Sequence, residues 1–340
     1  MEFVALLGNI QILRFVAASM VVLFHVALTA SNEGISPGLI QGFGIWGESG
    51  VDIFFVISGL VMMLSQSRKH RTAAAFLTER AIRILPMYWA LTLLLAGVLL
   101  VMPQLFNSDS FTLRKTLASL FMVNWLAGDG MPVLYLGWTL EYEWIFYVAF
   151  SLGFAVLPLR LAWIPVLAIL LLLNVAGFIG LFAIEFVYGM LIGLLFLRGN
   201  WRLPLPWLFV LLGFAAMAAH AYLPLQAVPR HIGYGIPAAM IVAGLIGLPQ
   251  ARGRLALLAG AASYSIYLVQ VFAIPVAFRI VKKLPALPDG VAALLVVAAS
   301  LLAGVLAYLL VEKPLTGLAL RIWGPRHDSG PVLTGAPPQR

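Results

Sequence analysis

The chain has 340 residues, of which 62% are hydrophobic and only 10% are charged. A soluble domain has about a quarter of its residues charged, so this composition excludes an ordinary soluble protein and indicates a membrane protein. The formal net charge is +8, but in a membrane protein the positions of Lys and Arg matter more than their sum, so no nucleic-acid partner is indicated. The chain has no cysteine, which excludes disulfides and a thiol nucleophile.

Apolar runs of the length that crosses a bilayer recur along the chain. We therefore expect an all-α, polytopic transmembrane helical bundle of about ten spans. The expected spans are 10–30, 49–66, 84–102, 138–157, 161–180, 182–197, 206–221, 231–248, 256–278 and 290–311. The segment 116–127 is too short to span comfortably and is expected to be re-entrant or interfacial. Residues 1–323 are expected to form one transmembrane domain, followed by a disordered Pro/Gly-rich tail over 324–340.

The distribution of Lys and Arg predicts the orientation. Ten spans put both termini on one side of the membrane. With the N-terminus inside, the inner loops carry fourteen Lys or Arg residues and the outer side carries six. Because cytoplasmic loops are enriched in positive residues, both termini are expected to be cytoplasmic.

The first expected span contains two ionisable residues, Arg14 and His25. A guanidinium in hydrocarbon costs about 2.5 kcal/mol or more, so such residues usually have a function or a partner. The two are eleven residues apart, which is about 20° beyond three helical turns and a rise of about 16 Å. They share one helix face at two depths, with Arg14 nearer the cytoplasm. The alternative is that each is a structural group that caps a helix end or pairs with a neighbour.

The second expected span begins with two acids, Glu48 and Asp52, on one helix face. Asp52 is the deeper acid, at a depth close to that of His25. An Asp beside a His can fix the tautomer of the ring and raise its basicity, as a general base requires. The alternative is that both acids stabilise the positive end of the helix dipole, which is the favoured interpretation for Glu48.

The fourth expected span presents Thr139, Glu143 and Tyr147 on one face, with Trp138 and Glu141 at its entrance. Aromatic residues are common at membrane interfaces, but an acid about one turn inside is not explained in this way. Together with Asp52 and His25, Glu143 gives a set that can handle a hydroxyl proton.

Two arginines, Arg80 and Arg83, precede the third expected span on its cytoplasmic side. Neighbouring guanidiniums can hold a phosphate, although anchoring by positive residues is an equal alternative. Glu185, Arg279 and Glu312 are candidates for structural pairs.

Two further histidines, His220 and His231, lie near loop edges and are expected to be satisfied surface groups rather than ligands. No metal-ligand spacing and no Gly-rich phosphate loop occurs, so no metal is expected.

Six motifs in order resemble the membrane acyltransferase-3 family. They are Arg14 and His25 with ten residues between them, "GVDIFFVISG", "RAIRILPMYW", "WTLEYEWIFY", "SYSIYLVQ" and "VEKPL". The resemblance covers residues 10 to about 320. Within the family, the chain is most similar to the ExoZ-like acyltransferases that modify exopolysaccharides.

The resemblance implies an integral membrane O-acyltransferase of the bacterial cytoplasmic membrane. Such an enzyme moves an acyl group, usually acetyl, from cytoplasmic acyl-CoA to a sugar hydroxyl of an envelope glycan. The implied partners are acyl-CoA as the donor, a glycan or lipid-linked saccharide as the acceptor, and the membrane lipid.

Carried over position by position, the resemblance implies three groups of site residues. The catalytic group is His25, Arg14, Asp52 and Glu143, the acyl-CoA group is Arg80, Arg83 and Arg14, and the expected substrate-binding group is Trp138, Tyr147, Ser58, Tyr264 and Tyr267. The chain has Gln270 where many members have His. Glutamine can hydrogen-bond but cannot act as a base.

The residues support two mechanisms. His25 either deprotonates the acceptor hydroxyl or carries the acyl group transiently. Ten helices with inward charges also describe a transporter or flippase of a lipid-linked glycan, although no inverted repeat is evident. A purely structural assembly component is the third alternative.

Overall fold

The computed structural model describes residues 7–38, 40–102, 112–128, 130–199, 201, 203–223, 227–284 and 287–324, and all regular structure within these ranges is helical. The helices are α1 (Gly8–Asn32), α2 (Ile40–Ile45), η2 (Gly47–Ser49), α3 (Gly50–Lys69), α4 (Ala73–Val101), α5 (Leu113–Leu120), α6 (Asn124–Ala127), α7 (Gly137–Val156), η4 (Leu159–Leu161), α8 (Trp163–Val175), η5 (Leu181–Ile184), α9 (Glu185–Leu197), α10 (Pro206–Tyr222), η6 (His231–Gly235), α11 (Ile236–Gly247), α12 (Arg254–Val281), α13 (Asp289–Ala307), η7 (Tyr308–Glu312) and α14 (Lys313–Trp323). The expected disordered tail lies almost entirely outside the described residues.

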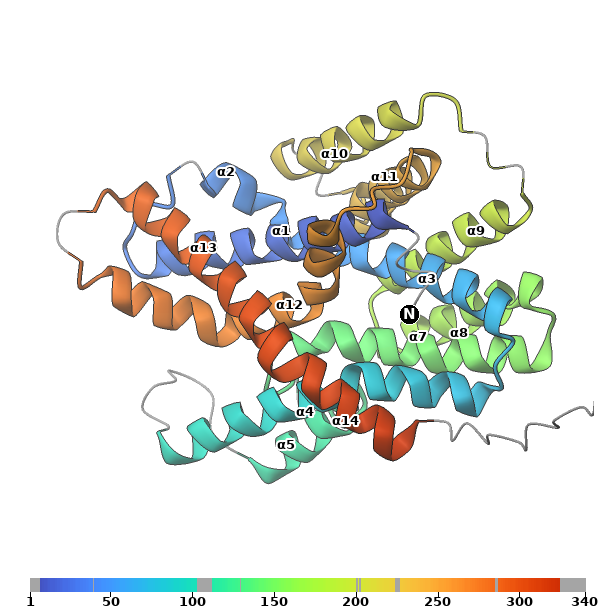
Figure 1. Ribbon diagram of the computed structural model, residues 1–340, viewed down its shortest axis with the longest axis horizontal. Helices are drawn as coiled ribbons and strands as arrows, with labels where there is room; N and C mark the ends of the chain where they lie inside the picture. Colours follow the sequence, from blue (N-terminus) through green and yellow to red (C-terminus); the bar gives the residue numbers. More distant parts are fainter. Residues whose placement is uncertain are drawn as a thin grey trace, which may run out of the picture.

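Each of the ten expected spans coincides with a helix, so the all-helical prediction is confirmed. Five helices in the described part of the chain are long and apolar enough to cross a membrane by length and composition. The longest, Asp289–Trp323, runs through α13, η7 and α14 and crosses the front of the molecule in Figure 1. The exact number of spans and the sides of the termini stay predictions.

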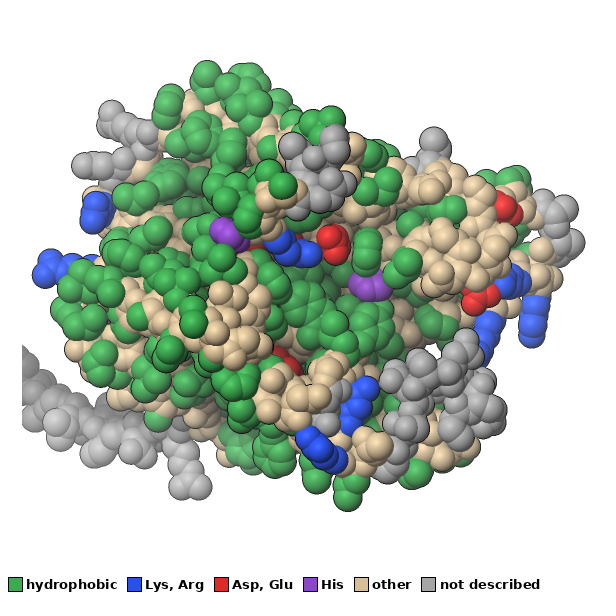
Figure 2. Space-filling model, turned by 180° about the vertical axis from the view of Figure 1, so that it is seen from behind, with side chains coloured by type: hydrophobic (Ala, Val, Ile, Leu, Met, Phe, Trp, Pro, Cys, Tyr) green, Lys and Arg blue, Asp and Glu red, His purple; other side chains and the backbone are tan. Residues whose placement is uncertain are grey.

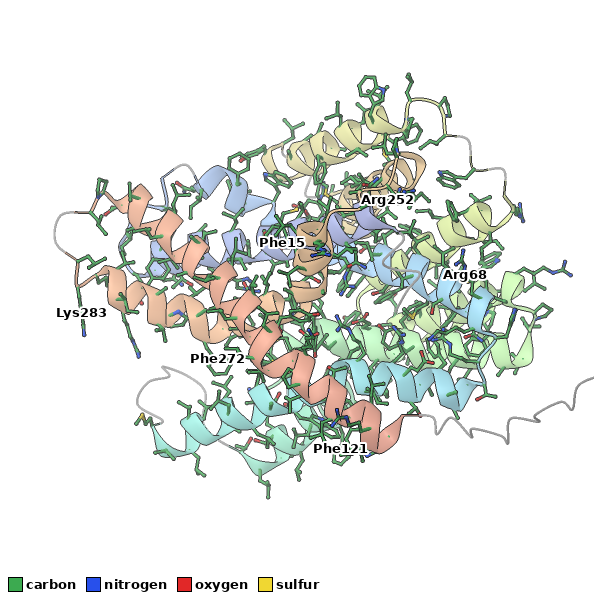
Figure 3. The ribbon with its side chains drawn as sticks, in the orientation of Figure 1. Phe15, Arg68, Phe121, Arg252, Phe272 and Lys283 are labelled. Atoms are coloured by element: carbon green, nitrogen blue, oxygen red, sulfur yellow. The ribbon has the colours of Figure 1, made fainter. Side chains whose placement is uncertain are left out.

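The exterior of the helical bundle is strongly apolar. Val175 is 85% exposed and Leu255 81% exposed, and hydrophobic side chains cover most of the face in Figure 2. Exposed apolar surface of this extent needs a lipid or protein partner. In Figure 3, Arg68 and Lys283 lie at opposite ends of the molecule, as expected for residues predicted to flank the two sides of a membrane.

The helix α4 begins earlier than expected, at Ala73 instead of residue 84. The Thr72 side chain accepts a hydrogen bond from the Ala75 N–H and so caps this start. Arg80 and Arg83, expected just before the span, therefore lie within the helix, one turn apart on one face.

Small residues bring α3 and α9 into close contact. A Cβ added to Gly59 would lie 1.9 Å from the Phe186 carbonyl oxygen, and one added to Gly189 would lie 1.9 Å from the Val56 oxygen. Membrane helices use glycine in this way to approach closely. The two helices run parallel in a fixed register, which brings their N-terminal acids to one level.

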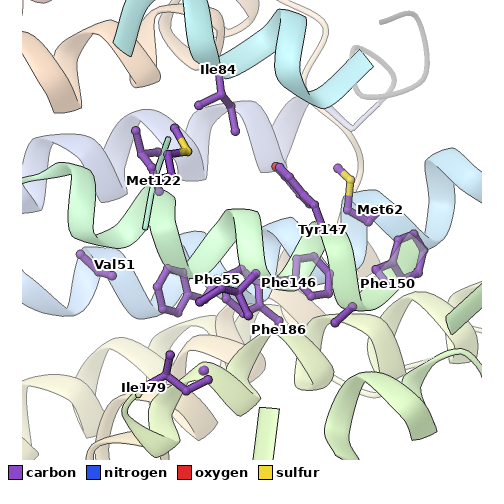
Figure 4. Packing of buried hydrophobic residues seen from close by; sticks show 14 of the residues in the cluster. Val51, Phe55, Met62, Ile84, Met122, Phe146, Tyr147, Phe150, Ile179 and Phe186 are labelled. Carbon is purple, nitrogen blue, oxygen red and sulfur yellow. The ribbon is translucent and has the colours of Figure 1, made fainter. Parts of the chain in front are cut away.

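Aromatic packing fixes α7 against the same pair of helices (Figure 4). The Phe186 ring stacks between Phe55 and Phe146, with centroid distances of 4.3 and 4.4 Å. Tyr147, also on α7, points away from this stack toward the side of Ile84 on α4 in Figure 4. One face of α7 therefore belongs to the core, and the opposite side is free to line a pocket.

Candidate functional site

A pocket opens where α1, α3, α4, α7 and α12 converge. Its empty volume is about 840 Å³, including open solvent at its mouth. The predicted residues that line it are Arg14, Ser58, Arg80, Arg83, Thr139, Glu143, Tyr147, Tyr264 and Tyr267. Residues from five helices, separated by up to 253 positions, thus meet in one place, and we call this the arginine pocket.

Arg83 forms an ion pair with Glu312, which lies 229 residues later in the chain. Its Nη1 donates to Glu312 Oε1 at 2.7 Å, and Ser265 Oγ donates to the other oxygen at 2.6 Å. Glu312 is buried in the π-helical turn η7. The prediction that Glu312 forms a structural pair is confirmed.

Arg14 and Arg80 are less well neutralised. Arg80 Nε is buried without a hydrogen-bond partner in the described part of the chain, and Arg80 Nη2 is 3.9 Å from Glu79. That carboxylate is already held by Arg71 at 2.6 Å. Arg14 interacts electrostatically with Glu143 but forms no hydrogen bond with another side chain within the described ranges. Positive charge therefore remains in the pocket.

Glu143 is the acid that lines this pocket. It accepts hydrogen bonds from Ser58 Oγ at 2.7 Å and from the Tyr147 hydroxyl. These two donors fix the carboxylate between α3 and α7. Tyr264 also faces the pocket, and its hydroxyl donates to the Ile84 carbonyl at 2.8 Å.

Tyr267 lines the pocket beside the N-terminal end of α7. Its hydroxyl is 2.9 Å from Thr139 Oγ1 and also donates to the Leu136 carbonyl. Tyr135 lies near Tyr267, and its ring is 5.6 Å from that of His25. His25 itself is not among the residues that line the pocket, so the tyrosines stand between the pocket and this ring.

The orientation of His25 is set by its own helix. Its Nδ1 lies 2.9 Å from the Val21 carbonyl oxygen, which can only accept. The contact therefore assigns the proton to Nδ1 and leaves the Nε2 lone pair available, the form that a general base requires.

Asp52 does not orient His25 as expected. Among the described residues, no hydrogen bond or ion pair joins them. Arg230 instead donates to both Asp52 oxygens, from Nε at 3.0 Å and from Nη2 at 2.8 Å. The interior holds an arginine in a fork that satisfies the buried acid better than a histidine would. Arg230 also lies 3.4 Å from Glu48, and we call Glu48, Asp52, Glu185 and Arg230 the Asp52 cluster.

Arg230 was not predicted as a site residue. The sequence placed it only among the six Lys and Arg residues expected on the outer side of the membrane. A signal was present: it directly precedes an apolar segment while Asp52 and Glu185 lack an obvious cation. Arg279 forms no ion pair within the described ranges, although such a pair was expected.

Trp138, which was expected to bind substrate, and Gln270, where the chain departs from the family pattern, do not line the pocket. Trp138 packs against Tyr142 and Phe182, with centroids 5.6 and 5.9 Å apart. Gln270 is buried and donates to the Tyr267 carbonyl at 2.8 Å. It therefore supports the helix that presents Tyr267.

Glu141 organises the segment expected to be re-entrant or interfacial. It accepts from the Asn124 N–H, from Asn124 Nδ2 and from the Trp125 N–H, at 3.1, 2.6 and 3.3 Å. The segment forms the short helices α5 and α6, tied in this way to α7.

Comparison with known proteins gives two matches. A family model described as an acyltransferase domain (Acyl_transf_3) matches residues 7–311. The exopolysaccharide production protein ExoZ of Rhizobium meliloti (strain 1021) is 34% identical over 293 residues, which covers 79% of this chain and 89% of that protein. No solved structure matches the chain.

Proposed function

Because the chain belongs to the membrane acyltransferase-3 family, as its motifs predicted, we propose that it moves an acyl group, typically acetyl, from acyl-CoA to a sugar hydroxyl. The name of the ExoZ relative supports an exopolysaccharide, or its lipid-linked precursor, as the acceptor. The charge bias of the loops supports a bacterial cytoplasmic membrane, with the donor arriving from the cytoplasm.

The observation that carries this proposal is the meeting of Arg14, Arg80 and Arg83 in one pocket. Coenzyme A is rich in phosphate, and guanidinium groups bind phosphate oxygens through charge-assisted, often bidentate hydrogen bonds. Arg83 shares its charge with Glu312, while Arg14 and Arg80 have charge left for a ligand. Arg14 and Arg80 are therefore the main donor-binding residues, and Arg83 is their support.

The reacting groups would meet near His25. Arg14 and His25 lie on one continuous helix, about 16 Å apart along its axis, so a donor held by the arginines must extend along α1 toward the ring. His25 Nε2 takes the proton of the acceptor hydroxyl as its oxygen attacks the thioester carbonyl. The C–S bond then breaks, and the imidazolium returns the proton to the departing thiolate. The products are the sugar ester and the free thiol.

Cells that lack the chain provide the test, after complementation with the wild type or with His25→Ala. We expect wild-type cells to release acyl groups from their polysaccharide on mild alkaline treatment. His25→Ala cells, with equal protein in the membrane fraction, should make the same amount of polysaccharide without these groups. Equal acylation in both would contradict the role of His25. Loss of the polysaccharide itself from the cell surface would instead indicate transport.

A further inference from the structure

The Asp52 cluster contains one more buried acid than its arginine accounts for. Asp52 and Glu185 are both 0% exposed, and the Arg230 fork is occupied by the two oxygens of Asp52. The Glu185 carboxyl lies beside that of Asp52. As a carboxylate, however, neither of its oxygens has a hydrogen-bond partner within the described residues.

The helix packing encloses Glu185. The register of α3 and α9, fixed at Gly59 and Gly189, places Asp52 and Glu185 at the same level. On the other side, a Cβ added to Gly235 would lie 2.7 Å from Glu185 Cγ. The acid is therefore held between α3 and η6.

A buried carboxylate without a donor is costly, and two adjacent carboxylates disfavour double ionisation. One proton removes both problems, because a neutral carboxyl can donate where a carboxylate can only accept. We infer that Asp52 and Glu185 hold one proton between them, with Glu185 as the neutral acid that donates to Asp52. Through Arg230, this hydrogen-bonded chain then positions Glu48 near His25.

Arg230 links the Asp52 and Glu185 pair to Glu48. Its Nη1 is 3.4 Å from Glu48 Oε1, and its guanidinium lies over the rings of Phe182 and Tyr234, 5.5 and 5.6 Å from their centroids. Glu48 is also close enough to His25 for an electrostatic interaction. Arg230 is thus a positioning residue, and only this part of the inference rests on the proposed function.

Infrared spectroscopy of the full-length protein in lipid nanodiscs tests the proton directly. We expect the carbonyl stretching band of a protonated carboxylic acid at neutral pH, and we expect Glu185→Gln to remove intensity from it. Asp52→Asn should also remove that intensity, because Glu185 then ionises to replace Asp52 beside Arg230. An unchanged band in Glu185→Gln would overturn the inference.

Thermal unfolding of the same variants gives an independent readout. An amide can replace a neutral acid and still donate to Asp52, so Glu185→Gln should stay within about 2 °C of the wild type. Asp52→Asn should unfold several degrees lower, and the double variant should lose more than the sum of the two, because no buried acid then remains beside Arg230 and only the partly exposed Glu48 is left. Additive losses, or a loss in Glu185→Gln equal to that in Asp52→Asn, would contradict the shared proton.

Arg230→Lys tests the positioning role, since it keeps the charge but not the fork. We expect the KM for the acceptor to rise by about tenfold or more, with an unchanged KM for acyl-CoA, because Arg230 does not line the arginine pocket. The positioning role would be refuted if the KM for the acceptor were the same in Arg230→Lys as in the wild type, with the KM for acyl-CoA also unchanged. If the wild type itself transfers no acyl group, the proposed function fails, while the infrared and unfolding results still decide the shared proton.

Discussion

The arginine pocket and the Asp52 cluster both bury charge, but they balance it in opposite ways. In the pocket, three arginines face Glu143, and Glu312 takes up part of the Arg83 charge. In the cluster, three acids surround Arg230, which is bound in a bidentate fork. The first region keeps a positive excess beside open space, and in the second the arginine is paired with acids of the protein itself.

This difference separates binding from support. A buried charge without a protein partner is stable only if water or a ligand completes it, whereas a paired charge fixes the backbone around it. Arg14 and Arg80 belong to the first kind, and Arg230 belongs to the second. The His25 ring is oriented by Val21, and its Nε2 has no hydrogen-bond partner among the described residues.

The largest effect is expected for the proposed general base, His25. His25→Ala should lower kcat for acyl transfer by about 10²–10⁴-fold, because general-base catalysis contributes that much. Steady-state assays on purified protein check this value. His70→Asn is the matched control, since His70 is exposed and its φ of 45° is tolerated by Asn. A kcat within twofold of the wild type for His25→Ala would remove His25 from the chemistry.

A second prediction probes the charge excess of the pocket. Arg80→Ala combined with Arg83→Ala should raise the KM for acyl-CoA roughly ten- to a hundredfold, because the charge-assisted hydrogen bond lost with Arg80 is worth about 1.5–3 kcal/mol and Arg83 already shares its charge with Glu312. The KM for the acceptor should not change. Arg68→Ala is the control. It removes a positive charge from the last turn of α3, outside the pocket. An equal rise in the control would reduce the arginines to a general surface charge.

The contact that holds the two regions in register is expected to have the next largest effect. Gly59→Ala would place a methyl group 1.9 Å from the Phe186 oxygen, and overpacking of this kind costs about 1–3 kcal/mol. Both donor and acceptor kinetics should suffer, because α3 carries Ser58 and Asp52. Gly97→Ala is the control: it meets nothing within 4 Å and should be neutral or slightly stabilising. Equal unfolding temperatures for the two variants would show that α3 and α9 can shift freely.

The smallest effect is expected for Glu143→Gln. The change removes the lining acid and increases the positive excess of the pocket, so acyl-CoA should bind about two- to fivefold more tightly, in line with the modest energy of a partly exposed charge pair. Titration calorimetry at two salt concentrations measures this gain, which should shrink at higher salt. Weaker binding in Glu143→Gln would mean that the carboxylate contacts the donor directly.

Much of the fold could be predicted from the sequence, because apolar runs of bilayer length leave few alternatives to helices. The helical period also placed Arg14 and His25 on one face, and the motifs indicated the family. The start of α4 was missed, since Arg80 and Arg83 interrupt the apolar pattern although the helix continues through them.

The partners within the site could be predicted less well. Similar membrane depths suggested that Asp52 lies beside His25. Depth alone, however, does not determine how each helix is rotated about its axis or which neighbour its side chains face. The choice of Arg230 as the partner depends on how η6 packs against α3, and Arg230 is 178 residues from Asp52 in the chain. The sequence signals that the buried acids need a cation, but which arginine supplies it depends on tertiary packing and has no local signal.

Donor binding in the arginine pocket and the catalytic base His25 occupy different positions in the proposed site. Equilibrium binding of a non-reactive acyl-CoA thioether to the purified protein tests this separation most directly, with the wild type, His25→Ala and the Arg80→Ala, Arg83→Ala double variant side by side. We predict that His25→Ala binds the thioether as tightly as the wild type and that the double variant binds at least tenfold more weakly. Wild-type affinity in the double variant, or lost binding in His25→Ala, would contradict the claim.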